Sequence, residues 1–348
     1  MARSCLLKEE KKMKLKYWIA VSIVAFSLGL QAQAKAETTL NGAGATFPFP
    51  IYSKWFDEYH KNHPDIKINY QSIGSGGGIK QFTARTVDFG ATDGPMSDKE
   101  MFAVDGKFLH IPTVLGGVVP AFNLPGVSNL TFDGNTLAGI FLGKIKSWDD
   151  PAIQSLNPEA KLPAKPIVVV HRADGSGTTY CFTDYLSAVN PEWKKTVGTG
   201  KSVNWPAGLG GKGNEGVAGL VKQNEGALGY VELIYAQSNH LAFGAVKNRA
   251  GKAVLANLES VSAAAASAKM PPDFRVSIVN APGENSYPIS TFTWFLVYEK
   301  NAGKTGAVLK DFLGWMLEDG EKMAPGLGYA PLPPNVEEMV KGAVQKIR

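Results

Sequence analysis

Cysteine is scarce in this sequence of 348 residues, which contains only Cys5 and Cys181. Cys5 precedes the N-terminal apolar segment, whereas a lipoprotein signal places its cysteine directly after such a segment, so nothing indicates a lipid anchor. If the N-terminal segment is removed on export, Cys181 has no partner and the mature chain has no internal disulfide. We therefore expect a large hydrophobic core to hold the fold, with Cys181 as a small buried side chain.

Long apolar runs are also lacking, since none reaches the length of a membrane-spanning helix. The apolar run over residues 19–30 follows the basic stretch KLKYW and precedes the small-residue stretch AQAKA, which is the pattern of a cleavable signal peptide. Residues 1–36 are predicted to be this signal, with translation starting at Met1 or Met13 and cleavage after Ala34 or Ala36. The mature chain is expected to be exported and soluble.

An excess of one charge sign is absent from the mature chain. The full sequence has a formal net charge of +5, but the predicted signal peptide holds seven basic and two acidic residues, which leaves 29 of each sign. We find no basic stripe interleaved with aromatic residues. Nucleic acid and acidic membrane surfaces are therefore disfavoured as partners.

Helical and strand-like patterns alternate along the rest of the chain, which indicates an α/β fold with a largely parallel sheet. In IYSKWFDEYHKN, Ile51, Trp55 and Tyr59 share one helix face. The runs PTVLGGVVPAF, PIVVVHR, ALGYVEL and TFTWFLVYE are predicted strands, and VLKDFLGWML is a predicted amphipathic helix. The alanine-rich stretch SAAAASA is expected to form a surface helix.

The length of the chain favours two domains over one. Extended segments meet proline near residues 123–125 and 287–288, and these are the predicted crossings between domains. Two crossings make one domain discontinuous. Lobe I is predicted to comprise residues 37–123 plus 287–348, and lobe II residues 124–286.

Three glycine-rich turns precede expected helices: GAGATFPFP, IGSGGGIKQF and RADGSGTTY. The free N–H groups in the first turn of a helix form an anion site. In the first stretch these groups lie near Thr46 and Phe47, and in the second Ser75 is expected at the helix N-cap. One such turn is usually only a cap, but three in one exported chain indicate an anion-binding protein.

Six motifs, in this order and covering nearly the whole mature chain, resemble the periplasmic phosphate-binding proteins of phosphate ABC transporters. They are GAGATFP, IGSGGGIKQ, VDFGATDGPMS, FLGKIKSWDD, RADGSGTTY and GLGGKGNEG. The resemblance implies a two-lobed α/β periplasmic binding protein of type II-like fold, with the ligand cleft between lobes joined by a two-segment hinge. It also implies a monomer in the periplasm that captures mono- or dibasic inorganic phosphate and delivers it to a membrane permease, without enzymatic activity, cofactor or metal.

The same resemblance implies the residues of the phosphate site. They are Thr46, Phe47, Ser75, Asp93, Arg172, Ser176, Gly177 and Thr178, supported by Asp174 and Gly76. Arg172 would supply a positive charge that Asp174 partly restrains. Two positions differ from the family pattern, because Gly76 stands where relatives often have serine and His171 where many have a second arginine. Both differences are expected to alter affinity or the local field without abolishing binding.

Asp93 is the residue from which selectivity is predicted. Aspartate in a DGP turn on its own would be explained as a turn initiator. Inside an anion site, however, its carboxylate repels the ligand unless the ligand donates a proton. Phosphate carries a proton near neutral pH and sulfate does not, so Asp93 is predicted to reject sulfate.

Several alternatives involve catalysis or metals. GLGGKG matches a dinucleotide-binding pattern with Glu232 at 19 residues' distance, but Pro206 breaks the preceding stretch as a strand. AGKTG lacks the first glycine of a phosphate loop, and Ser176 lacks the first glycine of a nucleophile elbow. His60 and His63 have no carboxylate or cysteine cluster for a metal. The strongest alternative is an exported phosphate-ester hydrolase or phosphoryl-transfer enzyme with the same anion cradle.

Overall fold

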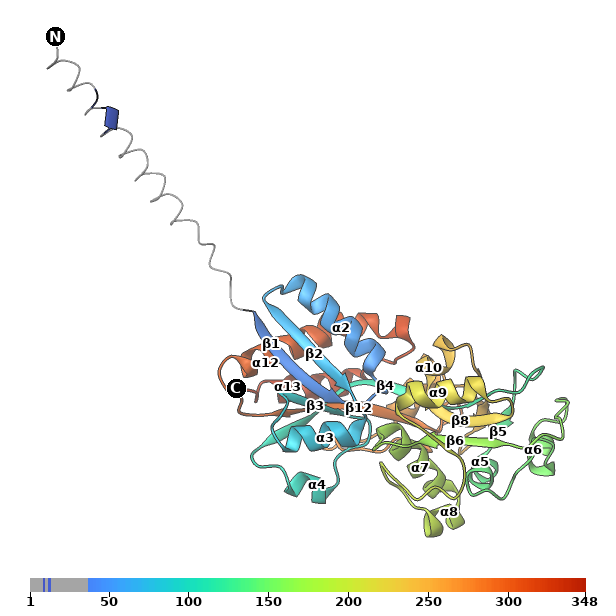
Figure 1. Ribbon diagram of the computed structural model, residues 1–348. Helices are drawn as coiled ribbons and strands as arrows, with labels where there is room; N and C mark the ends of the chain where they lie inside the picture. Colours follow the sequence, from blue (N-terminus) through green and yellow to red (C-terminus); the bar gives the residue numbers. More distant parts are fainter. Residues whose placement is uncertain (1–8, 10–11, 14–36) are drawn as a thin grey trace. The chain divides into compact units, whose positions relative to one another are not determined.

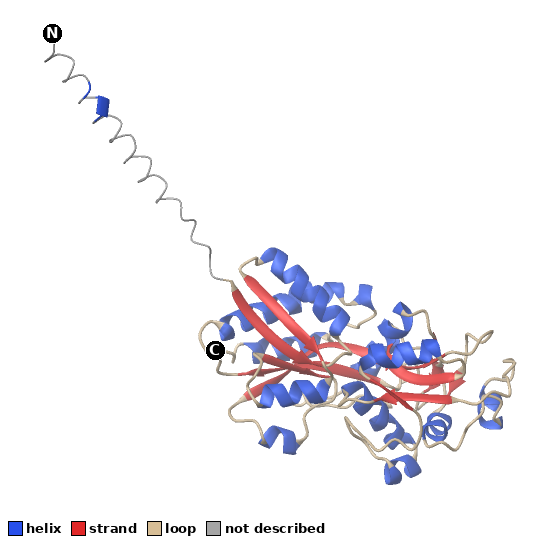
Figure 2. Ribbon diagram, in the orientation of Figure 1, coloured by secondary structure: helices blue, strands red, loops and turns tan. Residues whose placement is uncertain are grey.

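The strands form a large mixed sheet whose two halves share one long strand. The computed structural model describes residues 37–348 and, before them, residues 9, 12 and 13. Apart from those three residues, the predicted signal peptide with its cleavage site lies outside the described residues. Residues Thr39–Arg348 make up the unit that holds the sheet and its helices, which Figures 1 and 2 show.

The strands alternate with helices along most of the chain, as the sequence predicts. The strands are β1 (Thr38–Gly44), β2 (Ile66–Ser72), β3 (Phe89–Thr92), β4 (Phe108–Phe122), β5 (Thr131–Phe132), β6 (Val168–Arg172), β7 (Leu209–Gly211), β8 (Ala227–Glu232), β9 (Ala242–Phe243), β10 (Ala245–Lys247), β11 (Ala253–Val254) and β12 (Ser290–Tyr298). The α-helices are α2 (Phe49–Asn62), α3 (Ser75–Thr83), α4 (Asp98–Phe102), α5 (Gly134–Phe141), α6 (Pro151–Leu156), α7 (Gly177–Val189), α8 (Pro191–Thr196), α9 (Gly213–Gln223), α10 (Leu233–Ser238), α11 (Leu258–Ala266), α12 (Thr305–Trp315) and α13 (Pro334–Val344). A π-helical turn (Met316–Gly320) and two 3-10 turns (Glu321–Met323, Pro325–Leu327) follow α12.

The strand order of the large sheet is β2-β1-β3-β12-β4-β8-β6-β7, with β9 beside β4, and β11-β10-β5 form a separate small sheet. β1 runs parallel to β3, and β6 runs parallel to both β7 and β8. The longest strands are antiparallel, however, because β12 pairs antiparallel with β3 and β4, and β4 with β8. The predicted largely parallel sheet is therefore wrong at its centre, since an apolar run does not encode the direction in which a strand pairs.

The strand β4 belongs to both halves of the sheet. It pairs with β12 as far as Gly117 and with β8 from Val118 onward. From His110 to Phe122 all its residues are buried, and helices lie on both sides of the strands in Figure 2. Coverage of both faces explains why this run is apolar apart from His110 and Thr113. The exchange of partners precedes the predicted crossing at residues 123–125, and the lobe boundaries remain a prediction.

Helix α2 matches the predicted amphipathic helix. It begins after Pro48, and the buried face contains the predicted Ile51, Trp55 and Tyr59. The indole N–H of Trp55 donates to the carbonyl of Gly320 over 2.7 Å. The helix is thereby fixed to the C-terminal helical segments, and the turn before it is placed at one end of the sheet.

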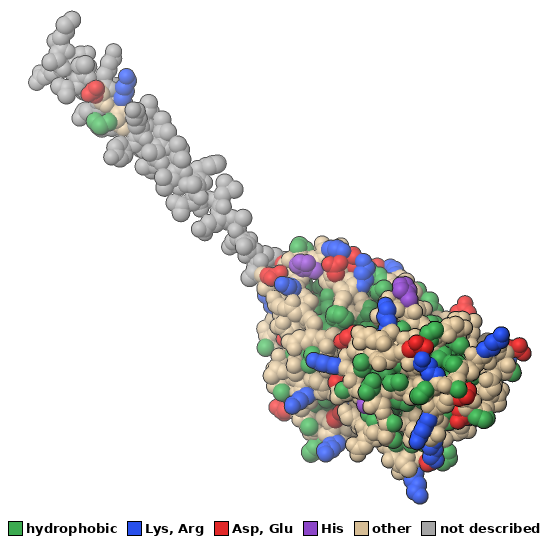
Figure 3. All heavy atoms as spheres, turned by 45° about the vertical axis from the view of Figure 1, so that its right-hand side comes forward, with side chains coloured by type: hydrophobic (Ala, Val, Ile, Leu, Met, Phe, Trp, Pro, Cys, Tyr) green, Lys and Arg blue, Asp and Glu red, His purple; other side chains and the backbone are tan. Residues whose placement is uncertain are grey.

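Other expectations about the core are mostly confirmed. Cys181 is a free, buried thiol whose pKa burial raises well above the usual value. The alanine-rich stretch is helical in α11 as far as Ala266, but Ala264 and Ala265 are buried, so the expected surface helix packs against the core. Within the described residues, none of the helices is long and apolar enough to cross a membrane. On the face shown in Figure 3, basic and acidic side chains are interspersed.

Candidate functional site

The second and third glycine turns meet at Asp93. The Ser75 hydroxyl oxygen accepts hydrogen bonds from the amide of Gly177 over 3.0 Å and from the amide of Asp93 over 3.2 Å. A Cβ atom on Gly177 would lie 2.5 Å from an Asp93 carboxylate oxygen and 2.6 Å from the Ser75 hydroxyl. Only glycine fits at this point, and three predicted site residues are thereby brought together. The amide of Gly177 is already paired with Ser75, so its predicted direct contact with a ligand is not evident from the geometry.

Gly76 has a steric explanation. Its amide donates to the carbonyl of Gly175 over 2.8 Å, and a Cβ atom on it would lie 3.1 Å from the Gly175 Cα. The absence of a side chain therefore allows α3 to approach the third turn closely. The prediction that Ser75 caps α3 is wrong, because Gly74, with φ of 84°, is the N-cap and Ser75 is the first helical residue. Its hydroxyl is consequently available to the site.

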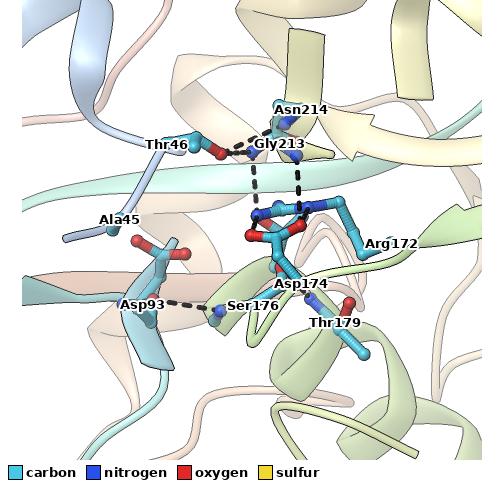
Figure 4. Close-up of polar contacts among 12 residues, drawn as sticks. Ala45, Thr46, Asp93, Arg172, Asp174, Ser176, Thr179, Gly213 and Asn214 are labelled. Carbon is cyan, nitrogen blue, oxygen red and sulfur yellow. Dashed lines mark hydrogen bonds and ion pairs between the residues drawn. The ribbon is translucent and has the colours of Figure 1, made fainter. Parts of the chain in front are cut away.

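The first and third turns are joined by a residue that the sequence analysis missed. The Asn214 side-chain amide donates to the hydroxyl oxygens of Thr46 over 2.8 Å and Thr178 over 3.0 Å, as Figure 4 shows for Thr46. Its carbonyl oxygen accepts from the amide of Glu232 over 2.9 Å. Asn214 lies in the first turn of α9, after the glycine-rich stretch GLGGKG. That stretch is a fourth glycine-rich turn before a helix, which the sequence analysis used for the family resemblance and as a dinucleotide pattern but not for the site.

Arg172 and Asp174 form a buried, two-bond ion pair (Figure 4). The distances are 2.7 Å from Nε to Oδ1 and 2.5 Å from Nη2 to Oδ2. The amide of Gly213 also donates to Asp174, and Arg172 Nη1 donates to the Thr178 hydroxyl over 3.4 Å. Burial acts to raise the pKa of Asp174, but the hydrogen bonds and charge of Arg172 prevail and lower it. The prediction that Asp174 restrains Arg172 is thus consistent with the geometry.

Four buried hydroxyls around these turns share one feature. Within the part of the chain that the structure describes, each one accepts hydrogen bonds, and Ser75 alone also donates, to the Asp93 carboxylate. They are Thr46, Ser75, Ser176 and Thr178, whose donors come from Asn214, Asp93, Gly177, Thr179 and Arg172. A hydroxyl whose lone pairs receive donors still has its own hydrogen to give. Thr46, Ser176 and Thr178 therefore form a set of oriented donors suited to a group with several acceptor oxygens, while the Ser75 hydrogen is directed to Asp93.

Asp93 is the acidic group among these donors. Its side chain is almost completely buried, and the Thr293 hydroxyl donates to it over 3.3 Å. Burial raises the pKa of Asp93 to about 7, while the nearby Arg172 charge acts in the opposite direction. Its carboxyl group can accordingly take up or release a proton near neutral pH. This matches the chemistry expected of a residue that accepts a hydrogen bond from a protonated ligand oxygen.

Phe47 can face the site only through its backbone. Its ring is fully buried and lies against Tyr329, with ring centroids 6.2 Å apart. The Tyr329 hydroxyl donates to the Phe47 carbonyl over 2.6 Å, and the Tyr235 hydroxyl donates to the Thr46 carbonyl over 2.5 Å. These two tyrosines, which the sequence did not single out, hold the first turn in place.

His171 does not add a second positive charge. Its ring stacks on Trp205 with centroids 4.8 Å apart, and burial lowers the pKa of the imidazole, which disfavours the charged form. The difference from the family pattern therefore leaves Arg172 without a charged neighbour at this position.

The geometry speaks against the dinucleotide and metal alternatives. The glycines of GLGGKG are partly in β7, paired with β6, and Glu232 is buried and accepts from the amide of Ile234. Burial raises the pKa of Glu232 well above its usual value. His60 and His63 each contact a backbone carbonyl. No cluster of three acidic, histidine or cysteine residues suited to a metal occurs among the described residues.

Comparisons with known proteins find relatives over nearly the whole chain. Residues 30–320 match the family model of the PBP superfamily domain. The chain is 47% identical over 330 residues to the phosphate-binding protein PstS of Pasteurella multocida, covering 93% of each chain. It is 41% identical over 334 residues to the phosphate-binding protein PstS of Methanocaldococcus jannaschii, covering 88% of this chain and 85% of that one.

Two solved structures support the fold. A high affinity periplasmic phosphate-binding protein, PfluDING, bound with phosphate, is 24% identical with a TM-score of 0.73 and covers 88% of this chain and 93% of its own. A putative phosphate ABC transporter substrate-binding protein from Clostridium perfringens is 20% identical with a TM-score of 0.63, covering 85% and 100% respectively. At these identities the likeness concerns the α/β architecture alone.

Proposed function

The chain belongs to the family of PstS phosphate-binding proteins, and from this premise we propose that it captures inorganic phosphate and delivers it to an ABC transporter permease for import. Relatives of this name cover nearly the whole chain at 45–47% identity. Both the mono- and the dibasic ion are ligands under this proposal, because each carries at least one proton for Asp93.

The observation that carries the proposal is the set of three buried hydroxyls, of Thr46, Ser176 and Thr178, that accept from the protein and have hydrogens to donate. A tetrahedral oxyanion has enough acceptor oxygens to use all three. Arg172 balances part of the ligand charge, and the amides of the first turn, at Thr46 and Phe47, complete the donor set. The residues proposed to form the phosphate site are Thr46, Phe47, Ser75, Asp93, Arg172, Ser176, Gly177 and Thr178.

Selection for phosphate is assigned to Asp93. A protonated phosphate oxygen donates to this carboxylate, which makes a charge-assisted hydrogen bond. Sulfate, which has no proton, would place two acceptors against each other in a buried site. An unpaired buried acceptor costs about 1–3 kcal/mol, and more when it is charged.

Two lobes that close on the ion follow from the same proposal. Lobe I would comprise residues 37–123 plus 287–348 and lobe II residues 124–286, so that Asp93 and Arg172 come from opposite lobes. Support comes from β4, which pairs with β12 in one half of the sheet and with β8 in the other. Closure would exclude water and strengthen the hydrogen bonds around the ligand.

The location of the protein in the cell and its partners are proposed from its N-terminal sequence pattern and its net charge. The predicted signal peptide would direct the chain to the periplasm, where a monomer would carry phosphate to the permease. The balanced charge of the mature chain gives no electrostatic attraction to nucleic acid. The alternative of a phosphate-ester hydrolase or phosphoryl-transfer enzyme has no support in the relatives' names, which are those of binding proteins.

Calorimetric titration of the mature protein tests this proposal. We expect one phosphate site per chain and sulfate binding at least about 100-fold weaker, which corresponds to about 3 kcal/mol. Equal affinities for the two ions would contradict the role of Asp93. Release of phosphate from a phosphate ester by the purified protein would favour the enzyme alternative.

Thr178→Val is expected to weaken phosphate binding by about 1–3 kcal/mol with the fold intact. The substitution keeps the shape of the side chain but removes a donor to the ligand and the acceptor of Asn214 and Arg172. Thr183→Val, five residues further along α7, removes a buried hydroxyl that donates to the carbonyl of Thr179, and serves as control. Equal phosphate affinities of wild type and Thr178→Val would show that the third turn only caps α7.

A further inference from the structure

The segment that follows Asp93 is held by a lysine from a distant loop. Lys201, between α8 and β7, donates from Nζ to the carbonyl of Pro95 over 3.0 Å and to the carboxylate of Glu100 over 2.9 Å. Only 12% of the Lys201 side chain is exposed. Glu100 also accepts from the amide and hydroxyl of Ser97, so the lysine contacts the start of α4 at a rigid point.

The backbone of Lys201 connects the same loop to the anion cradle. Its carbonyl accepts from the amide of Ser176 over 2.8 Å. Tyr180, one turn into α7, places its ring 5.5 Å from the lysine Nζ. Lys201 therefore links the third turn, through its carbonyl, to the segment after Asp93, through its side chain.

A second cation holds the same segment from another part of the chain. Arg275, between α11 and β12, donates from Nη1 to the carbonyl of Met96 over 2.9 Å and to Asp98 over 2.8 Å. Its Nε donates to Asp273 over 2.8 Å. This contact is more open to solvent, because 93% of the Asp98 side chain is exposed.

We propose that Lys201 and Arg275 form a clasp on residues 95–100 that holds the closed conformation and sets the rate at which phosphate leaves. The proposal rests on the proposed function and its division into lobes, in which both cations belong to lobe II and the clasped segment to lobe I. Neither cation contacts the four cradle hydroxyls through its side chain. The clasp therefore acts on the duration of closure, and ion recognition is left to the cradle.

The two contacts contribute unequally. Opening the lobes would separate the Lys201 ammonium from two acceptors in a nearly buried setting, where charge-assisted hydrogen bonds are strongest. The Arg275–Asp98 pair is at the surface, where ion pairs contribute little and salt screens them. Lys201 is accordingly the main residue of the clasp and Arg275 an accessory one.

The rate of phosphate release from the mature protein tests the clasp. It is measured by a rapid chase, in which excess unlabelled phosphate is added to protein that holds labelled phosphate. We expect Lys201→Gln to increase the dissociation rate roughly 10- to 100-fold and Arg275→Gln up to about 5-fold. Association rates should change less than about twofold, because the cradle is untouched. The ratio of phosphate to sulfate affinity should stay at its wild-type value, and Lys201→Arg should restore slow release at least partly.

Lys252→Gln is the matched control, since it removes a lysine from an exposed ion pair with Glu284 and should leave release unchanged. Glu100→Gln provides a second route if Lys201→Gln folds poorly. Glutamine retains the capping box at this position but loses the charge that faces Lys201. It should speed release by an intermediate factor.

The outcomes separate the clasp from the function on which it rests. A wild-type protein that binds no phosphate would overturn the proposed function. Binding by wild type with unchanged dissociation rates in both Lys201→Gln and Glu100→Gln would overturn the clasp alone. A loss of affinity that arises in the association rate, or that alters the phosphate-to-sulfate ratio, would place Lys201 in recognition and overturn it as well.

Discussion

Asp93→Asn should raise sulfate affinity relative to phosphate affinity by roughly 100-fold, or about 3 kcal/mol. The amide can donate as well as accept, and the substitution removes the negative charge that opposes a proton-free anion. Phosphate affinity itself should change less, because the loss of a charge-assisted hydrogen bond is offset by the loss of a repelling charge. Calorimetry with both ions, in one buffer at one salt concentration, measures the ratio.

The pH dependence provides a second readout of the same residue. Burial in the structure raises the pKa of the Asp93 carboxyl from its ordinary 3.8 to about 7, and a hydrated, open site would return it toward the ordinary value. The raised pKa means that the closed site favours the protonated acid, so sulfate binding has to take up one proton. Sulfate affinity of wild type should thus rise by about 10-fold for each unit that the pH falls between 7 and 5.

Asp93→Asn has no proton to take up and should show no such slope for sulfate. Phosphate brings its own proton, and its affinity in wild type should vary much less than that of sulfate across this interval. If the phosphate-to-sulfate ratio of Asp93→Asn equals that of wild type, Asp93 is not the selectivity element. The DGP turn would then be explained by turn formation alone.

The fold could be predicted from the sequence where local pattern decides the structure. The helix α2 and the strands β4, β6 and β8 follow from the spacing and continuity of apolar residues. Pairing direction could not be predicted, because β12 lies beside β4 after a long stretch of chain and its sequence is compatible with either direction. The place where β4 changes partners depends on the same long-range pairing.

The site could be predicted from the sequence where a short motif determines the local backbone structure. The three turns that hold Thr46, Ser75 and Thr178 do come together, since glycine before a helix places amides and hydroxyls at one edge. Asn214 and Lys201 act through contacts with residues 168 and 106 positions away, respectively. No local spacing encodes such a contact. The direction of the Thr46 and Thr178 hydroxyl hydrogen bonds depends on Asn214 and therefore became visible only in the structure.

Arg172→Met should weaken phosphate binding by at least roughly 1000-fold, or about 4 kcal/mol. The substitution removes a buried positive charge beside the cradle and leaves Asp174, with 15% of its side chain exposed, without its ion-pair partner. The carboxylate then adds a second negative charge near the anion. Removal of one member of a buried pair is costly for this reason.

Two matched variants separate the lost cation from the unpaired carboxylate. Arg172→Lys keeps the charge but cannot form the two parallel bonds to Asp174, so an intermediate loss is expected. The double variant Arg172→Met with Asp174→Asn should bind phosphate at least about 10-fold more tightly than Arg172→Met, because the unpaired charge is gone. Calorimetry of the three variants measures these differences.

The role assigned to Arg172 would be wrong if Arg172→Met bound phosphate with an affinity within about 10-fold of wild type. That result would show that the hydroxyls and amides bind the anion without a cation.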